Sequence, residues 1–78
     1  MAKLNMVKAL NLALREEMER DRDVLIIGED VGVDGGVFRV TEDLQRTFGS
    51  QRVIDSPLAE AAIIGTSVGM ALYGLKPV

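Results

Sequence analysis

Residues 61–75 are the longest stretch without a charged side chain, and this stretch limits what the chain can fold into. From residue 61 to residue 73 a helix would be apolar or small on every face, with Gly65 and Gly69 one turn apart. Such a helix is typical of a large core or an interface, and paired glycines let another backbone approach closely. It is shorter than the roughly 20 apolar residues that cross a bilayer. We therefore expect a buried helix, which a chain of 78 residues is too small to surround.

The rest of the chain alternates between helical segments and short β-branched runs. Helices are expected over residues 6–21, 41–48 and 58–73, strands over residues 24–28 and 52–55, and the start of a third strand over residues 76–78. This order predicts an α/β fold with a parallel sheet, in which three helices alternate with two strands and a strand stub. So few strands rarely form a stable sheet alone, so we expect a fragment of a larger domain.

Capping residues are expected at the helix ends. The expected caps are Asn5 for the first helix, Thr41 or the residues before it and Gly49 for the second, and Ser56 with Pro57 and then Gly74 for the third. With Ser56 as the N-cap, Glu60 would lie one residue too late to complete a capping box.

Composition argues against several classes of function. Nine Lys and Arg against 12 Asp and Glu give a net charge of −3, which argues against a nucleic-acid partner. Neither Cys nor His is present, so there is no disulfide, zinc site, thiol nucleophile or Ser-His-Asp triad. Proton chemistry is left to Asp, Glu, Lys or Tyr73. The first residues do not look like a targeting signal, and we expect a cytoplasmic protein without a membrane partner.

The glycine-rich segment 28–36 fits no phosphate-binding or calcium-binding motif. Its glycines have the wrong spacing for a dinucleotide fingerprint, it lacks the lysine of a P-loop, and it lacks two ligand positions of a calcium loop. We interpret it as an irregular turn at the carboxyl end of a strand. Ligands of open α/β sheets bind at that edge.

Glu60 is the candidate site residue that stands out. From residue 53 to residue 78 the only other charges are Asp55 and Lys76, and Glu60 lies in the first turn of the apolar helix. On spacing alone, a favourable interaction with the helix dipole is the preferred interpretation. If Glu60 is buried, its carboxyl group is instead suited to giving and taking a proton.

Four segments carry a resemblance to a known family, namely residues 28–32 (GEDVG), 35–42 (GGVFRVTE), 52–60 (RVIDSPLAE) and 74–78 (GLKPV). They resemble the start of the β subunit of the thiamine-diphosphate-dependent decarboxylating component of 2-oxo acid dehydrogenase complexes, of the pyruvate or branched-chain type. The resemblance covers the whole chain. It implies that residues 1–78 are the N-terminal, incomplete part of a transketolase-like pyrimidine-binding domain.

The resemblance also implies a chemistry, the oxidative decarboxylation of a 2-oxo acid with acyl transfer to a lipoyl group. It implies that Glu60 hydrogen-bonds N1′ of the aminopyrimidine of thiamine diphosphate, where proton exchange leads to loss of the proton at C2. Leu58 would lie against the aminopyrimidine ring. With the resemblance in view, we favour this role for Glu60. Glu29 would line an acidic proton relay between paired sites, although a solvated loop acid is an equal interpretation.

The sequence departs from the family at two positions and lacks one segment. Ser56 replaces the usual threonine, and Asp43 replaces a common glycine, which should help the second helix. Nothing resembles the segment that holds the diphosphate and Mg²⁺, which the resemblance assigns to an α subunit. We therefore expect no metal ligand here, an inactive chain when isolated, and an α₂β₂ heterotetramer that serves a lipoyl acyltransferase core.

Two alternatives remain open. Exposed strand edges and the apolar third helix would also suit a non-catalytic α/β module that self-associates. A third interpretation keeps the cofactor and changes the enzyme to an acetoin dehydrogenase or a transketolase-like β half. The segments quoted above do not select the 2-oxo acid.

Overall fold

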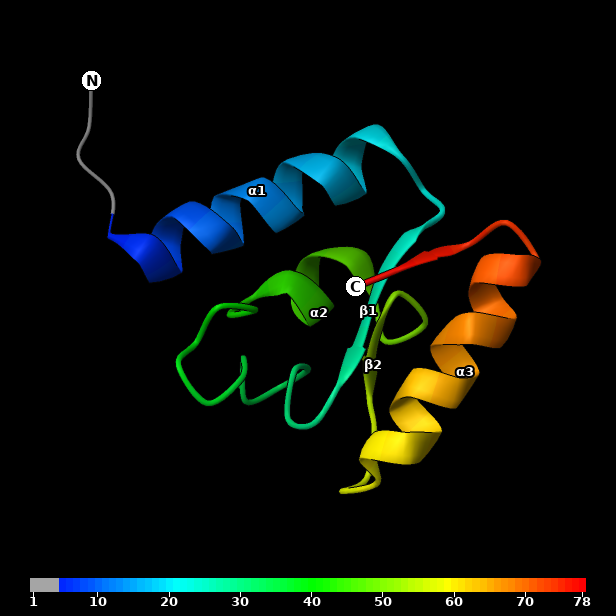
Figure 1. Cartoon of the computed structure of the whole chain (residues 1–78). Coiled ribbons are helices and arrows are strands. Elements are labelled where there is room, and N and C mark those ends of the chain that lie inside the picture. Colours follow the sequence, from blue (N-terminus) through cyan, green and yellow to red (C-terminus); the bar gives the residue numbers. More distant parts are fainter. Residues whose placement is uncertain (1–4) are drawn as a thin grey trace.

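The computed structural model describes residues 5–78, which alternate between helices and strands (Figure 1). In chain order the elements are α1 (Met6–Arg20), β1 (Val24–Gly28), α2 (Leu44–Phe48), β2 (Val53–Asp55), α3 (Glu60–Leu72) and β3 (Lys76–Pro77). The strands form one parallel sheet in the order β2-β1-β3. The predicted α/β fold with a parallel sheet is confirmed, and the expected strand stub is β3.

The strand β1 is the central strand of the sheet, with β2 on one side and β3 on the other. Ile26 pairs with Val53 of β2, and Val24 pairs with Lys76 of β3. Val24, Leu25 and Ile26 are all buried. A continuous β-branched run suits this position, since a strand inside a parallel sheet is covered on both faces.

The helix α1 begins and packs largely as its pattern predicts. The side chain of Asn5 accepts a hydrogen bond from the Lys8 amide at 2.8 Å, so Asn5 is the N-cap. Met18 is buried and Leu14 is partly buried, whereas Leu10 remains 46% exposed. The apolar stripe is therefore fully covered only toward the C-terminal end of α1.

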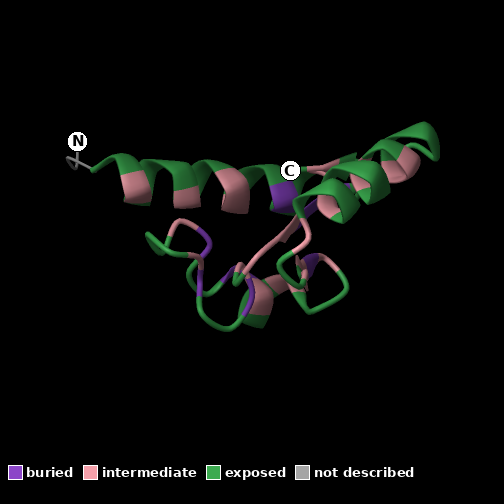
Figure 2. Ribbon diagram, turned by 60° about the horizontal axis from the view of Figure 1, so that its bottom comes forward, coloured by how far each residue is buried: buried purple, intermediate pink, exposed green. Residues whose placement is uncertain are grey.

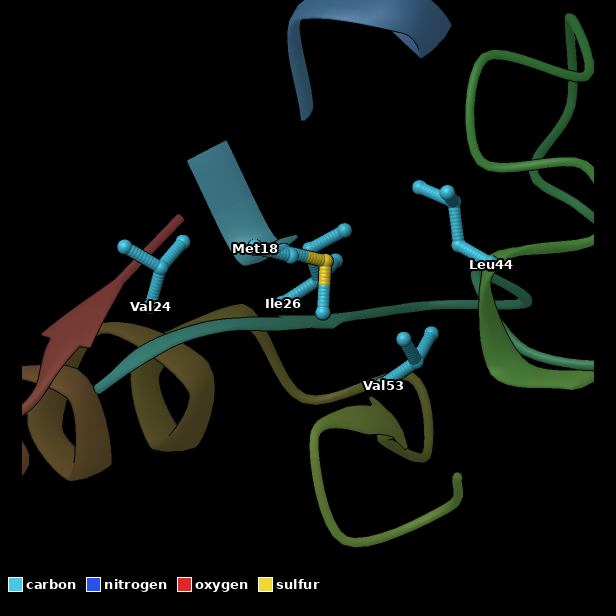
Figure 3. Close-up of a cluster of buried hydrophobic side chains, with 5 residues drawn as sticks. All are labelled: Met18, Val24, Ile26, Leu44 and Val53. Atoms are coloured by element: carbon cyan, nitrogen blue, oxygen red, sulfur yellow. The ribbon is translucent and has the colours of Figure 1, made fainter. Parts of the chain in front are cut away.

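One cluster of apolar side chains forms the core between α1, α2 and the sheet (Figure 3). Its fully or nearly fully buried members are Met18, Val24, Ile26, Leu44 and Val53. In Figure 3 the side chains of β1 and β2 point toward the part of α1 that carries Met18. Burying each such side chain contributes about 1.5–3 kcal/mol, so this cluster is what orders the sheet.

The second helix is shorter than predicted and begins three residues later. The Thr41 hydroxyl does not cap it, because this buried hydroxyl donates to the Val31 carbonyl at 2.8 Å. Asp43 precedes the helix with φ of 65°, a left-handed conformation that favours glycine and works against the expectation that Asp43 helps the helix. Its side chain nevertheless pairs with Arg46 of the helix at 3.2 Å. Gly49, with φ of 93°, ends the helix as predicted.

The third helix also begins later than predicted, at Glu60, and Ser56 is not its N-cap. The Ser56 amide donates to the Gly28 carbonyl at 2.8 Å, so it continues the β ladder instead. Ala59 takes the cap position without a side-chain hydrogen bond, and Glu60 becomes the first helical residue. Gly74, with φ of 94°, follows the end of the helix as expected.

The helix α3 contacts β1 and β3, yet none of its residues is buried by the described chain (Figure 2). Several of its large apolar side chains are well exposed, with Ile64 at 66% and Leu72 at 82%, whereas Ile63 and Met70 are half-buried. A Cβ atom added at Gly65 or Gly69 would meet nothing within 4 Å. The expected burial is therefore not found within residues 5–78, and the expectation that this chain cannot surround the helix is confirmed.

Candidate functional site

Three acidic residues lie at the carboxyl edge of the sheet. Glu29 directly follows β1, Asp55 ends β2, and Glu60 opens α3 after a short connection. The strand ends are paired, because Gly28 lies opposite Asp55 in the parallel register. Two neighbouring parallel strands thus deliver these acids to one edge, where ligands of α/β sheets bind.

The Glu60 side chain is exposed, so the burial considered from the sequence is not found in residues 5–78. Glu60 is the only acidic residue in the first turn of α3, a place where the helix dipole stabilises a negative charge. The ion pairs formed among the described residues do not include it. Its carboxylate is therefore available to a ligand.

Leu58 lies two residues before Glu60 and is 80% exposed. The preceding Ser56 hydroxyl donates to the Pro57 carbonyl at 3.0 Å, which leaves the hydroxyl turned onto its own backbone. An exposed apolar side chain and an exposed carboxylate therefore lie two residues apart in the chain.

Glu29 is half-buried in the turn that follows β1. The next residue, Asp30, has φ of 55°, and its carbonyl accepts a hydrogen bond from the Gly36 amide at 2.6 Å. Segment 29–36 is therefore closed by its own backbone. The structure places Glu29 and Glu60 at the same edge of the sheet, on segments that follow adjacent strands.

Sequence reasoning missed the role of Asp55. Its Oδ1 atom accepts a hydrogen bond from the Gly32 amide at 2.7 Å, across 23 positions of the chain. The sequence held one usable signal. An acidic residue ends one predicted strand, and the neighbouring predicted strand leads into a glycine-rich loop. Nothing in the spacing shows that the two segments touch.

Three hollows lie elsewhere on the molecule, and neither Glu29 nor Glu60 lines them. One of about 300 Å³ separates α1 from β3, one of about 220 Å³ separates α1 from segment 39–43, and one of about 440 Å³ separates the Gly32–Val33 turn from α2.

The described residues hold no group of three or more His, Cys, Asp or Glu side chains arranged to bind a metal ion. No helix within residues 5–78 is long and apolar enough to cross a membrane.

A parallel α/β sheet with carboxylates at its carboxyl edge defines a class of ligand-binding α/β domain. Residues 2–78 match the family described as "Transketolase, pyrimidine binding domain", and the chain belongs to this family. It is 59% identical over all 78 residues to the pyruvate dehydrogenase E1 component subunit beta of Staphylococcus epidermidis and of Staphylococcus aureus. The chain spans 24% of the length of these relatives. The resemblance seen in the sequence motifs is confirmed.

Proposed function

We propose that the chain belongs to the β subunit of a pyruvate dehydrogenase-like enzyme, which decarboxylates a 2-oxo acid and passes the acyl group to a lipoyl group. The observation that carries this proposal is the 59% identity across the whole chain to pyruvate dehydrogenase E1 beta subunits. We further propose that residues 1–78 are one incomplete part of the pyrimidine-binding domain, since the chain spans 24% of these relatives.

The residues at the sheet edge fit the pyrimidine half of thiamine diphosphate. Glu60 offers a carboxylate at the helix start, and Leu58 offers an exposed apolar surface beside it. No metal-binding cluster is present within the described residues. We therefore assign the diphosphate and Mg²⁺ to a partner α subunit, in an α₂β₂ assembly that serves a lipoyl acyltransferase core. A cytoplasmic location is part of the same proposal.

In this proposal each residue has a separate task. When bound, thiamine diphosphate supplies the carbon nucleophile that attacks the carbonyl of the 2-oxo acid. Glu60 holds and exchanges the proton at N1′ of the aminopyrimidine, which requires hydrogen-bond contact between the two groups. Leu58 packs on the ring and keeps water from that face. Glu29, half-buried at the same edge, passes protons toward the site.

The test is the variant Glu60→Gln in the complete enzyme that contains this chain. Glutamine keeps the size of the side chain and removes the carboxyl group that can give and take a proton, so we expect hydrogen–deuterium exchange at C2 of the bound cofactor to slow by about 10²–10⁴-fold. Glu16→Gln, an exposed change on α1, is the matched control and should exchange normally. Normal exchange in Glu60→Gln would refute the role of Glu60.

One specific observation supports a second function for the isolated chain. Several apolar side chains of α3 are exposed, and Ile64 and Val68 among them lie one turn apart on its surface. A non-catalytic module that self-associates through α3 would cover them.

A further inference from the structure

Residues 28–32 form an arch at the end of β1, and both ends of this arch are bonded to the end of β2. The Gly28 carbonyl accepts a hydrogen bond from the Ser56 amide at 2.8 Å. The Gly32 amide donates to the Asp55 carboxylate at 2.7 Å. Glu29 lies inside the arch, so two hydrogen bonds to adjacent residues define its position.

The Asp55 carboxylate fits closely against the arch. A Cβ atom at Gly32 would come within 2.2 Å of Asp55 Oδ2 and 2.6 Å of Gln45 Nε2. Gln45 Nε2 also donates to the Val53 carbonyl at 2.9 Å, which anchors this amide to β2. A side chain at position 32 would therefore push the ends of the Asp55 and Gln45 side chains away from the arch.

A second contact holds the arch from its other side. The buried Thr41 hydroxyl donates to the Val31 carbonyl at 2.8 Å. Asp30, between Glu29 and Val31, has φ of 55°, a conformation that L residues adopt at a cost. Fixed contacts on both sides are what keep such a residue in place.

We propose that Asp55 is a positioning residue, whose carboxylate holds the arch that carries Glu29 in a fixed place relative to segment 55–60, which carries Glu60. The proposal rests on the proposed function in assigning proton transfer to the two glutamates. Both glutamates are connected to the end of β2. Glu29 is connected through the hydrogen bonds of the arch, and Glu60 through the chain that follows Asp55. Proton transfer requires hydrogen-bond reach, and a displacement of about 1 Å can slow a reaction by about 10²-fold.

Amide hydrogen exchange in the full chain tests the contact directly. In Asp55→Ala the Gly32 amide loses its acceptor, and we expect its exchange to rise about tenfold, as expected for a hydrogen bond to a charged group. The Ile26 amide, which donates to the Arg52 carbonyl at 2.8 Å, should be unchanged and shows that the sheet is intact. Asp55→Asn keeps an oxygen acceptor and should restore part of the protection. Asp34→Ala, in the same loop and exposed, is the matched control.

A second variant reaches the same contact without touching Asp55. In Gly32→Ala the new methyl group displaces the carboxylate, so we expect the protection of segment 29–32 to fall as in Asp55→Ala. Unchanged Gly32 exchange in Asp55→Ala, or equal defects in Asp55→Asn and Asp55→Ala, would overturn the proposal.

Turnover in the complete enzyme separates positioning from folding. We expect Asp55→Ala to lower kcat about tenfold or more, with substrate KM within about twofold, because the reacting groups are displaced and substrate binding is not. Asp55→Asn should recover most of kcat. An unchanged kcat in Asp55→Ala would refute the positioning role. If Glu60→Gln exchanges normally at C2 while Asp55→Ala still loosens Gly32, the proposed function fails and the contact of Asp55 with the arch stands.

Discussion

The guanidinium group of Arg52 donates a hydrogen bond to the backbone carbonyl of Met18 at 2.8 Å, across 34 positions of the chain. The same Nη2 atom donates to the carbonyls of Asp21 and Val24 at 3.0 and 2.8 Å. The guanidinium also lies 5.1 Å from the centre of the Phe48 ring. One side chain thus joins the end of α1, the start of β1 and the end of α2.

Replacing Arg52 with methionine should destabilise the fold. Methionine keeps an apolar stem and removes every donor, so we expect the free energy of unfolding to fall by about 2–3 kcal/mol. Arg52→Lys should recover only part of this, because an ammonium group cannot reproduce the planar fork of donors. Urea unfolding followed by circular dichroism measures the difference. Arg22→Met, exposed in the turn after α1, is the control, and an equal loss in both variants would contradict this role.

The ion pair between Asp21 and Lys76 should make stability depend on pH. The hydrogen bond from Lys76 lowers the pKa of Asp21 in the folded chain, and the bond to Asp21 raises the pKa of Lys76. The contribution of Asp21 is therefore present above the pKa of an unfolded aspartate and is lost as pH falls through its folded pKa. The contribution of Lys76 is lost as pH rises through the folded pKa of Lys76.

Unfolding curves recorded across the acid and alkaline ranges test this pair. Asp21→Asn should flatten the acid limb of the stability profile, and Lys76→Met should flatten both limbs because it also removes the partner of Asp21. Asp34→Asn, an exposed change in the loop after β1, is the control. Identical acid limbs in the parent chain and in Asp21→Asn would rule the pair out as their source.

Replacing Thr41 with valine should cost about 1–3 kcal/mol of stability, because the Val31 carbonyl loses its partner inside the protein. Valine has nearly the same shape, so the loss reports the hydroxyl alone. Thermal unfolding compares this variant with Thr66→Val on the exposed surface of α3. Equal melting temperatures of Thr41→Val and Thr66→Val would show that the buried Thr41 hydroxyl does not stabilise the loop that contains Val31.

Charges on the exposed face of α3 should prevent self-association of the isolated chain. Ile64 is 66% exposed and Val68 is 57% exposed, so lysine at both positions should be tolerated by the fold and should break an apolar contact between copies. Sedimentation velocity at several concentrations measures the change in mass. Leu12→Lys on α1, where Leu12 is 43% exposed, is the control. A monomer at every concentration in the parent chain would exclude the self-associating module.

The sequence predicted correctly those elements that depend on residues close together in the chain. Asn5 is the N-cap of α1, and the β-branched run of β1 forms the central strand. The starts of α2 and α3 were predicted too early because the expected capping residues form hydrogen bonds with other segments. Thr41 donates to Val31, and Ser56 donates to Gly28. Such bonds depend on segments that meet only after the sheet forms.

The candidate site shows the same division. Glu60 stood out from the sequence because it is the lone acid of an apolar helix, and the motif around it indicated Leu58 and Glu29 as well. The contact between Asp55 and Gly32 joins two strand ends, and no spacing within one segment encodes it. The roles of Glu29, Leu58 and Glu60 in catalysis stay predictions.

The order of the strands in the sheet has a consequence for how the chain reaches its fold. The central strand β1 pairs on one side with β2, the next strand along the chain, and on the other side with β3, the last strand. The contact between Lys76 and Asp21, which accompanies the β3 pairing, closes a loop of 55 positions. Closing a longer loop costs more chain entropy, so the β1–β2 ladder should form early and the β3 edge late. Until then, one side of β1 is an open template, and a chaperone or a second nascent chain can compete for it.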